Sequence, residues 1–221
     1  MKRYKEYLKV LFFLPFYFFA LLPFAACSED DNSVEEYPNW QNTNSAYWDN
    51  LFTTTQQKIA GGDSSWKIIK NFSLSDSLQS PNTDYVIVNV EKNGTDSGCP
   101  LYTDSVQVRY TGQLLPSTSH PDGYVFDTTN SDSVPDSQAG VANFAVSGLV
   151  SGFQTALQHM HIGDKWKVYI PWTLGYGTTQ SSSSNIPAYS VLIFDIELVA
   201  YSHAGSNLPD FKAKRNNWVS E

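Results

Sequence analysis

The strongest constraint on the fold is a set of segments in which apolar and polar residues alternate. Residues 191–199 form the longest of them, with four apolar side chains on one face and Asp195 and Glu197 on the other. A period of two buries one face of a β-strand and leaves the other face in water. Shorter segments with this pattern lie at residues 85–90, 106–110 and 165–170. Together they predict an antiparallel sheet whose strands are joined by turns.

One short amphipathic helix is predicted just before the strand at 165–170. Its apolar stripe has the i, i+3, i+4, i+7 spacing of a helix face that packs on a core, and it consists of Phe153, Ala156, Leu157 and Met160. Gly163 is expected to end this helix, since glycine readily terminates helices. One helix among hairpin-connected strands predicts an α+β fold, in which an antiparallel twisted sheet half-wraps the helix.

The part of the chain before this sheet predicts a second helix. Tyr47, Leu51 and Ile59 have helical spacing within residues 40–60, and Gly61-Gly62 follows as a stop signal. Residues 66–69 suit a short strand or a cover for a core edge. We therefore expect an N-terminal helical appendage at 40–82, packed on the main domain or used for dimerisation. The main domain is expected at 83–202, and a polar tail at 203–221.

The first residues predict a secretion signal rather than part of the fold. A basic start precedes an apolar run over residues 10–26, and the small pair Ala25-Ala26 precedes Cys27. This layout resembles a bacterial lipoprotein signal, in which residues 1–26 are removed and Cys27 is lipidated. An ordinary signal peptide and a single membrane anchor are the alternatives. Pro15 and Pro23 argue against the anchor, because they interrupt a short span.

An acidic tether is expected at residues 27–39. Its opening Ser28-Glu29-Asp30-Asp31 resembles the export signal of Bacteroidetes lipoproteins, which directs them to the outer leaflet of the outer membrane. A solvated tether that faces the periplasm is the alternative. The predicted location is therefore the cell envelope, as an outer-membrane lipoprotein that is either periplasmic or surface-facing, with the membrane reached through the lipid on Cys27.

Charge and residue types exclude several functions. The formal net charge is −8, so bulk attraction to nucleic acid is excluded. His159 and His161 lie two residues apart without a carboxylate or thiol at ligand spacing, so no metal site and no cofactor are predicted. No phosphate-binding loop or nucleophile elbow occurs in the sequence. Cys99 is expected to be a buried inert thiol or, alternatively, to pair between molecules. An enzyme of this composition has to work without metal or covalent intermediate.

Four segments in the same order resemble FKBP-type peptidyl-prolyl cis-trans isomerases. They are VQVRYTGQL from Val106, GYVFDTT from Gly123, NFAVSGLVSGFQTALQHMHIGDKWKVYIPWTLGYG from Asn143, and NIPAYSVLIFDIEL from Asn185. The resemblance covers roughly residues 85–201. It implies the half-wrapped sheet that the alternation predicts independently. It also implies a peptidyl-prolyl isomerase that acts on exported polypeptides.

The resemblance implies a proline pocket made mostly of aromatic residues. Asp127, Tyr176 and Ile186 are the expected catalytic residues: the Ile186 N–H would bind the substrate carbonyl, the Tyr176 hydroxyl would support it, and Asp127 would set the polar field. The residues expected to bind substrate are Tyr110, Phe126, Phe144, Leu149, Val150, Phe153 and Phe194. Read by residue type alone, the phenylalanines would be core residues and the tyrosines half-buried surface residues.

The sequence departs from the family at positions that affect this pocket. Phe153 stands where familiar members have tryptophan, and no Arg or Lys lies between Asp127 and Phe144 to pair with the aspartate. Residues 115–124 form a longer loop than in minimal members. These departures predict altered rate or selectivity.

The partners that the resemblance implies are proline-containing unfolded or nascent exported polypeptides, with macrolide inhibitors as further ligands of the pocket. Two other functions stay open. One is a catalytically weak proline-peptide binding module or holdase on a lipid anchor. The other is a surface lipoprotein of an uptake complex that reuses the fold.

Overall fold

The computed structural model describes residues 34–75, 77–95, 98–130, 140–181, 185–206 and 208. The chain divides into two compact units, Met1–Val34 and Glu35–Glu221, and the second unit carries the fold described here. The predicted signal peptide and Cys27 lie outside the described residues, so both stay predictions. Within the described part, no helix is both long enough and apolar enough to cross a membrane.

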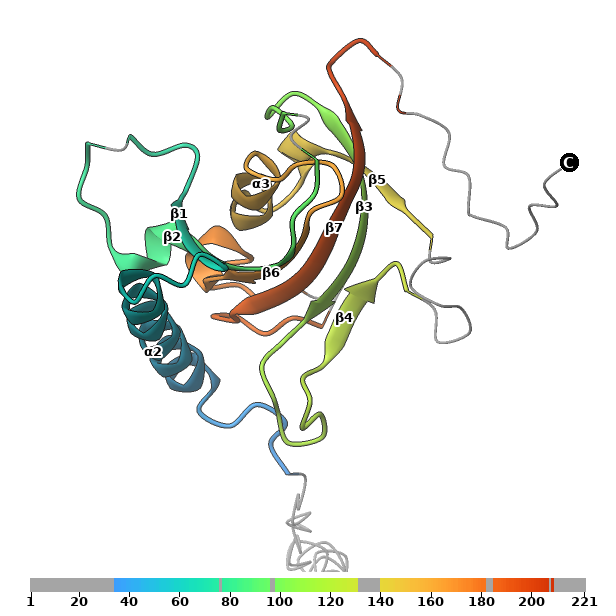
Figure 1. The fold of residues 1–221 in the computed structure, drawn as a ribbon. Coiled ribbons are helices and arrows are strands. Elements are labelled where there is room, and N and C mark those ends of the chain that lie inside the picture. Colours follow the sequence, from blue (N-terminus) through green and yellow to red (C-terminus); the bar gives the residue numbers. More distant parts are fainter. Residues whose placement is uncertain are drawn as a thin grey trace, which may run out of the picture. The chain divides into compact units, whose positions relative to one another are not determined.

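The predicted antiparallel sheet is present, and its seven strands lie in the order β1-β2-β6-β7-β3-β4, with β5 also paired to β3 (Figure 1). The strands are β1 (Trp66–Lys70), β2 (Tyr85–Lys92), β3 (Ser105–Gln113), β4 (Val125–Thr128), β5 (Ala142–Ala145), β6 (Lys165–Ile170) and β7 (Leu192–Ser202). The outer side of β3 is shared, because its first half pairs with β5 and its last three residues pair with β4.

The sheet curves around one short helix, α3 (Ser151–Leu157), which lies on its concave face (Figure 1). Alternation places the core here: Trp166, Val168 and Ile170 of β6 are each at most 1% exposed, while the residues between them are half-exposed. The α+β prediction is therefore confirmed. The helix ends at Leu157, earlier than expected. Gly163, the expected stop, lies in the turn before β6, where it has a φ of 88°.

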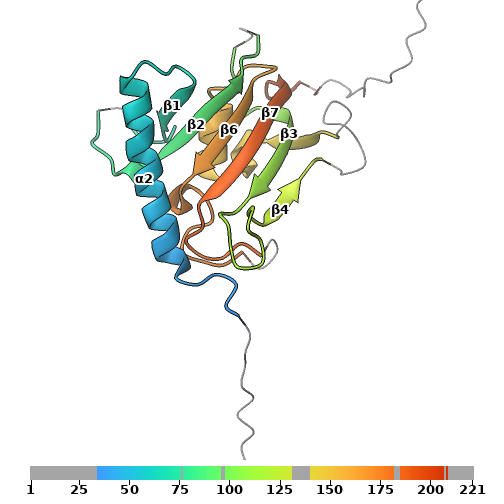
Figure 2. The same cartoon turned by 60° about the horizontal axis from the view of Figure 1, so that its bottom comes forward.

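The second helix, α2 (Trp40–Ala60), has the predicted bounds and packs on the convex face of the sheet beside β1 and β2 (Figure 2). Its Phe52 ring lies 5.8 Å from the Tyr85 ring, and the Lys58 ammonium lies 3.6 Å from the centre of the Trp66 ring. Tyr85 and Trp66 point away from the face that α3 covers, since the register places them opposite the core side. The helix therefore packs on its own sheet.

Contacts cross three of the boundaries expected from sequence. Strand β1 pairs along its whole length with β2, so the sheet begins well before residue 83. Glu35 and Glu36 of the expected tether form hydrogen bonds to the loop at 117–120, among them those of the Glu36 carboxylate. The start of the expected tail is also bound, since His203 Nδ1 lies 2.8 Å from Asp104 Oδ2. The first contact is backbone pairing, and the other two are made by side chains that lie far apart in the sequence.

Cys99 also differs from expectation. The thiol is partly exposed rather than buried, and its Sγ lies 3.7 Å from Nε2 of His161.

Candidate active site

A cavity of about 260 Å³ opens on the concave side of the sheet, next to α3. It is lined by Tyr110, Phe126, Asp127, Phe144, Gly148, Leu149, Val150, Phe153, Tyr176 and Phe194. The structure thus brings together nine of the ten residues predicted for the proline pocket, and it adds Gly148. Ile186 is the predicted residue that is missing from the lining.

Neighbouring elements supply these side chains in a fixed register. In β3, Gly112 pairs with Asp127 of β4 on one side and with Phe194 of β7 on the other. Phe144 enters from β5, while Phe153 comes from the first turn of α3. Because strand register fixes which side chains share a face, these residues meet on the concave side.

Gly112 makes the room that the aromatic rings occupy. A Cβ at this position would lie 2.6 Å from Cε2 of Phe126 and 2.6 Å from Cε1 of Phe194, too close for either ring to stay in place. The glycine also lies inside β3, which continues beyond the alternating segment predicted at 106–110. Sequence reasoning missed this contribution, although a glycine inside an alternating strand is a known signal of close approach by another group.

The floor of the pocket is made of buried aromatic rings. Phe153 and Phe194 are 3% and 5% exposed, and their rings meet edge to face with centroids 5.0 Å apart. Phe126 contacts Phe194 in the same way at 5.5 Å. Edge-to-face packing presents the positive edge of one ring to the negative face of the next and fixes the rings in place. The result is a rigid apolar surface suited to a small ring.

The polar wall of the pocket is built on one hydrogen bond. The Tyr110 hydroxyl donates to Oδ2 of Asp127 at 2.5 Å, from a ring that is only 8% exposed. Burial, then the hydrogen bond to Asp127, raises the pKa of Tyr110 well above its ordinary value, so the hydroxyl stays protonated and remains a donor. The Asp127 carboxylate is itself exposed at the mouth.

Tyr176 forms the opposite part of the mouth. Its side chain is 41% exposed, and it lies in the turns that follow β6. Burial raises the pKa of its hydroxyl first, and the negative charge of Asp127 adds to the shift. Two tyrosine hydroxyls and one carboxylate therefore surround an opening above an apolar floor.

The structure does not support the role expected for Ile186. Its side chain is fully buried, and its backbone N–H donates to the Ser181 carbonyl at 3.3 Å, while its carbonyl accepts from the Ser181 N–H at 2.9 Å. The N–H is thus used within the protein. Val150 lines the pocket and is the N-cap residue of α3. Its backbone N–H has no hydrogen-bond acceptor among the described residues, so it is available to a ligand.

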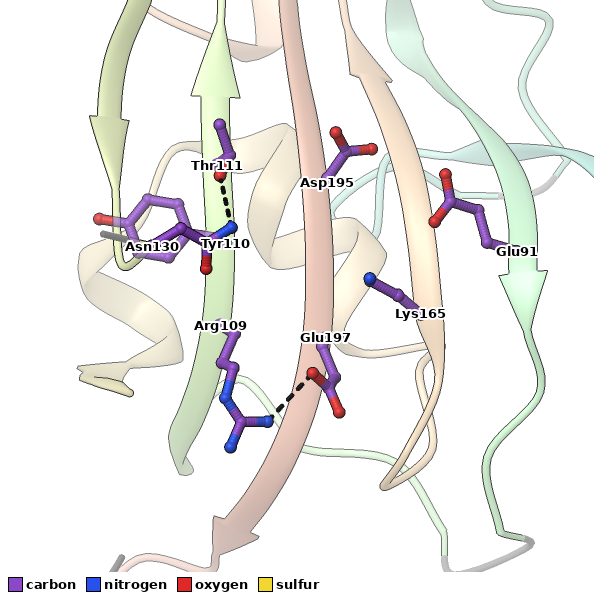
Figure 3. A pocket seen from close by; sticks show the side chains of 8 residues that line it. All are labelled: Glu91, Arg109, Tyr110, Thr111, Asn130, Lys165, Asp195 and Glu197. Carbon is purple, nitrogen blue, oxygen red and sulfur yellow. Dashed lines mark hydrogen bonds and ion pairs between the residues drawn. The ribbon is translucent and has the colours of Figure 1, made fainter. Parts of the chain in front are cut away.

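A second cavity, of about 210 Å³, lies on the convex face and has different chemistry (Figure 3). Figure 3 shows Arg109, Glu197, Lys165 and Glu91 in one row across four strands. The Arg109 guanidinium lies 3.0 Å from the Glu197 carboxylate. In the next row, the Lys167 ammonium lies 3.2 Å from the Asp195 carboxylate. Charges that already pair across strands keep this half of the face solvated, and they offer no apolar surface for a proline ring.

No cluster of three or more potential metal ligands occurs among the described residues.

Comparisons with known proteins agree on one family. Residues 100–199 match the FKBP-type peptidyl-prolyl cis-trans isomerases. The chain is 36% identical over 107 residues to the FKBP-type 22 kDa peptidyl-prolyl cis-trans isomerase of Escherichia coli, covering 48% of this chain and 46% of that protein. It is 35% identical over 112 residues to the macrophage infectivity potentiator of Trypanosoma cruzi, covering 51% and 50%.

A solved peptidyl-prolyl isomerase from Pseudomonas syringae is 25% identical with a TM-score of 0.46, covering 70% of this chain and 96% of that one. The chain spans about half the length of the curated relatives it matches.

Proposed function

We propose that this chain, of which residues 100–199 belong to the FKBP-type peptidyl-prolyl cis-trans isomerase family, catalyses cis-trans exchange of X–Pro bonds. The observation that carries the proposal is the pocket itself. A dry aromatic floor lies beneath an Asp127 carboxylate that is held by the Tyr110 hydroxyl at 2.5 Å. The apolar floor suits a prolyl ring, and the polar wall suits the amide next to it.

The pocket accelerates the rotation because it stabilises the planar and twisted states of the imide to different extents. Rotation about the imide bond costs about 18–20 kcal/mol, because twisting removes the C–N resonance. The planar imide is more dipolar than the twisted one, so water stabilises the ground state more than the transition state. The pocket floor of Phe153 and Phe194 excludes that water. The planar ground state then loses more hydration free energy than the twisted transition state, so the barrier to rotation is lower.

Specific groups then hold the substrate. Phe126, Phe153 and Phe194 enclose the prolyl ring, and Asp127 supplies a fixed negative charge near the twisted amide. The hydrogen bond to the substrate carbonyl, expected from the Ile186 N–H, is instead donated by the backbone N–H of Val150 at the start of α3. Tyr176 donates its hydroxyl to the same part of the peptide, since its raised pKa keeps the proton in place.

The substrates are proline-containing exported polypeptides, and the protein acts at the cell envelope through a lipid on Cys27. Support for this location comes from the basic, apolar and small-residue pattern that precedes Cys27. A similar protein from Legionella longbeachae, 37% identical over 105 residues, is named as an outer membrane protein. Replacement of Cys27 by alanine should release the protein from membranes into the soluble fraction, and continued membrane attachment would contradict the lipid anchor.

The isomerase activity is tested by exchange NMR on a short X–Pro peptide with the full chain in mild detergent. Uncatalysed exchange takes on the order of 10–100 s, so catalysis is visible as line broadening or exchange peaks at low enzyme concentration. Asp127→Leu should lower the rate while the protein stays folded. Binding of the peptide without faster exchange in the wild type would refute catalysis and favour a proline-binding module.

A further inference from the structure

Two loops lead into strands that carry pocket side chains, and residues just before α2 and in its first turns contact both of them. One is the β3–β4 loop, residues 114–124, which leads to Phe126 and Asp127. The other is the β7 lead-in loop, residues 185–191, which leads to Phe194. We infer that Glu36, Trp40 and Asn44 form a clamp that positions both loops, an inference that rests on the proposed function. All three clamp residues lie outside the stretch that matches the FKBP-type family.

The first side of the clamp is a carboxylate surrounded by donors. Glu36 accepts from the Ser117 hydroxyl at 2.6 Å, from the Ser119 hydroxyl, and from the Ser119 backbone N–H at 3.2 Å, while His120 Nδ1 lies 3.1 Å away. The Thr118 N–H also donates to the Glu36 carbonyl at 3.2 Å. The hydrogen bonds to the carboxylate, with that from Ser117 the largest contributor, lower the pKa of Glu36 to about 2, so the group is ionised at neutral pH.

The β3–β4 loop transmits this contact to the pocket. Its two ends are joined by a hydrogen bond from the Leu114 N–H to the Tyr124 carbonyl at 2.9 Å. The His120 ring packs edge to face on the Tyr124 ring with centroids 5.0 Å apart. Tyr124 lies two residues before Phe126, so a loop held at His120 fixes where β4 begins.

The second side of the clamp is buried. The Trp40 indole N–H donates to the Ser190 hydroxyl at 2.8 Å, and that hydroxyl donates to the Pro187 carbonyl at 2.7 Å. The Asn44 side-chain oxygen accepts from the Val191 N–H at 2.7 Å, while its amide donates to the Trp40 carbonyl at 2.8 Å. Trp40, Asn44 and Ser190 are 8%, 0% and 3% exposed.

Burial is what makes this second contact specific. A buried donor that loses its partner cannot turn to water, so the Val191 N–H holds the lead-in loop in the one arrangement that satisfies it. Val191 lies three residues before Phe194, on the strand that forms the pocket floor. Residues from outside the family match thus hold the starts of both strands, β4 and β7, that carry pocket side chains.

A clamp of this kind affects substrate binding more than the chemical step. If the loops loosen, only a fraction of the molecules has the pocket in its binding-competent arrangement, and the apparent affinity falls by that fraction. KM should then rise while kcat stays constant. A residue that only stabilises the fold behaves differently, because partial unfolding lowers kcat by loss of active protein and leaves KM unchanged.

The test compares four variants of the full chain in mild detergent. Trp40→Phe keeps the ring and removes the indole donor, Glu36→Ala removes the carboxylate, and Glu36→Gln keeps one acceptor oxygen as a conservative rescue. Thr53→Ala is the matched control, because Thr53 is exposed on the same helix and bonds only to the Asp49 carbonyl. The measurements are kcat and KM for an X–Pro peptide, its Kd, and amide hydrogen exchange at Leu114 and Val191.

We expect Trp40→Phe and Glu36→Ala each to raise KM by about 2- to 10-fold at constant kcat. Exchange at the Val191 N–H should be faster in the first variant and at the Leu114 N–H in the second. Glu36→Gln should recover part of the loss, and Thr53→Ala should match the wild type. Unchanged KM and exchange, or a fall in kcat with KM unchanged, would overturn the clamp. If the wild type lacks isomerase activity, the proposed function fails, and peptide Kd with amide exchange then decides the clamp alone.

Discussion

Removal of one hydroxyl group, in Tyr110→Phe, tests whether the orientation of Asp127 matters to the reaction. The hydroxyl donates to Oδ2 of Asp127 at 2.5 Å, and the rest of the ring packs against Phe144, Phe153 and Phe194. Phenylalanine keeps those ring contacts. The substitution therefore removes the hydrogen bond and leaves the shape of the pocket floor unchanged.

The size of the effect follows from the exposure of the two groups. A hydrogen bond to a charged group contributes roughly 1.5–3 kcal/mol. Asp127 is exposed, so water replaces part of what Tyr110 supplied, and we expect a loss of about 1.5 kcal/mol in the free energy of unfolding. If the same amount is lost from the transition state, kcat/KM falls by about tenfold, since each 1.36 kcal/mol is a factor of ten in rate.

Urea unfolding and exchange NMR on an X–Pro peptide measure the two quantities on the same preparation. Tyr85→Phe is the control, because Tyr85 lies on the opposite face of the sheet, against α2. A loss of stability with an unchanged exchange rate would refute the reasoning, because Asp127 would then be free to turn without consequence for catalysis. An equal loss of rate in Tyr85→Phe would also refute it.

Further predictions concern the pocket floor and the titrating groups. Gly112→Ala should cost about 1–3 kcal/mol of unfolding free energy and lower kcat/KM, because its Cβ would displace the rings of Phe126 and Phe194; unchanged urea unfolding would contradict this. The pKa of Glu36 is lowered to about 2 from 4.5, so its stabilising effect is complete above pH 4.5 and is lost as the pH falls towards 2. Acid titration should show this loss in the wild type and not in Glu36→Ala. Burial raises the pKa of Tyr47 to about 12 from 10.0, so its contribution is complete below pH 10 and is lost as the pH rises towards 12. Tyr47→Phe should flatten that alkaline decline in urea unfolding.

Much of the fold could be predicted because alternation and helical spacing are local properties of the chain. The strand at 165–170 and the helix at 40–60 have the predicted bounds, since each is set by its own apolar pattern and its own stop signals. The pocket residues other than Ile186 could be predicted because a family resemblance fixes their order along strands, and strand register then brings them to one face.

The predictions that differed from the structure depend on partners that no local pattern identifies. Ile186 lies within the expected motif, yet its N–H donates to the Ser181 carbonyl, and no residue pattern in the motif indicates that pairing. The sequence predicted that Glu36 belongs to an acidic tether. Its three side-chain partners lie more than 80 positions later, so the local sequence gives no sign of them. Strand β1 has too short a pattern to identify by itself, and it is defined by its pairing with β2.

The sequence by itself therefore predicted both helices and the four strands with clear alternation, β2, β3, β6 and β7, because periodicity needs only neighbouring residues. The family resemblance added most of the residues of the proline pocket. Only the tertiary structure showed that α2 contacts the loop that leads into β7. The Trp40–Ser190 and Asn44–Val191 hydrogen bonds join positions 150 and 147 residues apart. The free energy of such buried bonds depends on where the rest of the chain excludes water, and no local pattern records that.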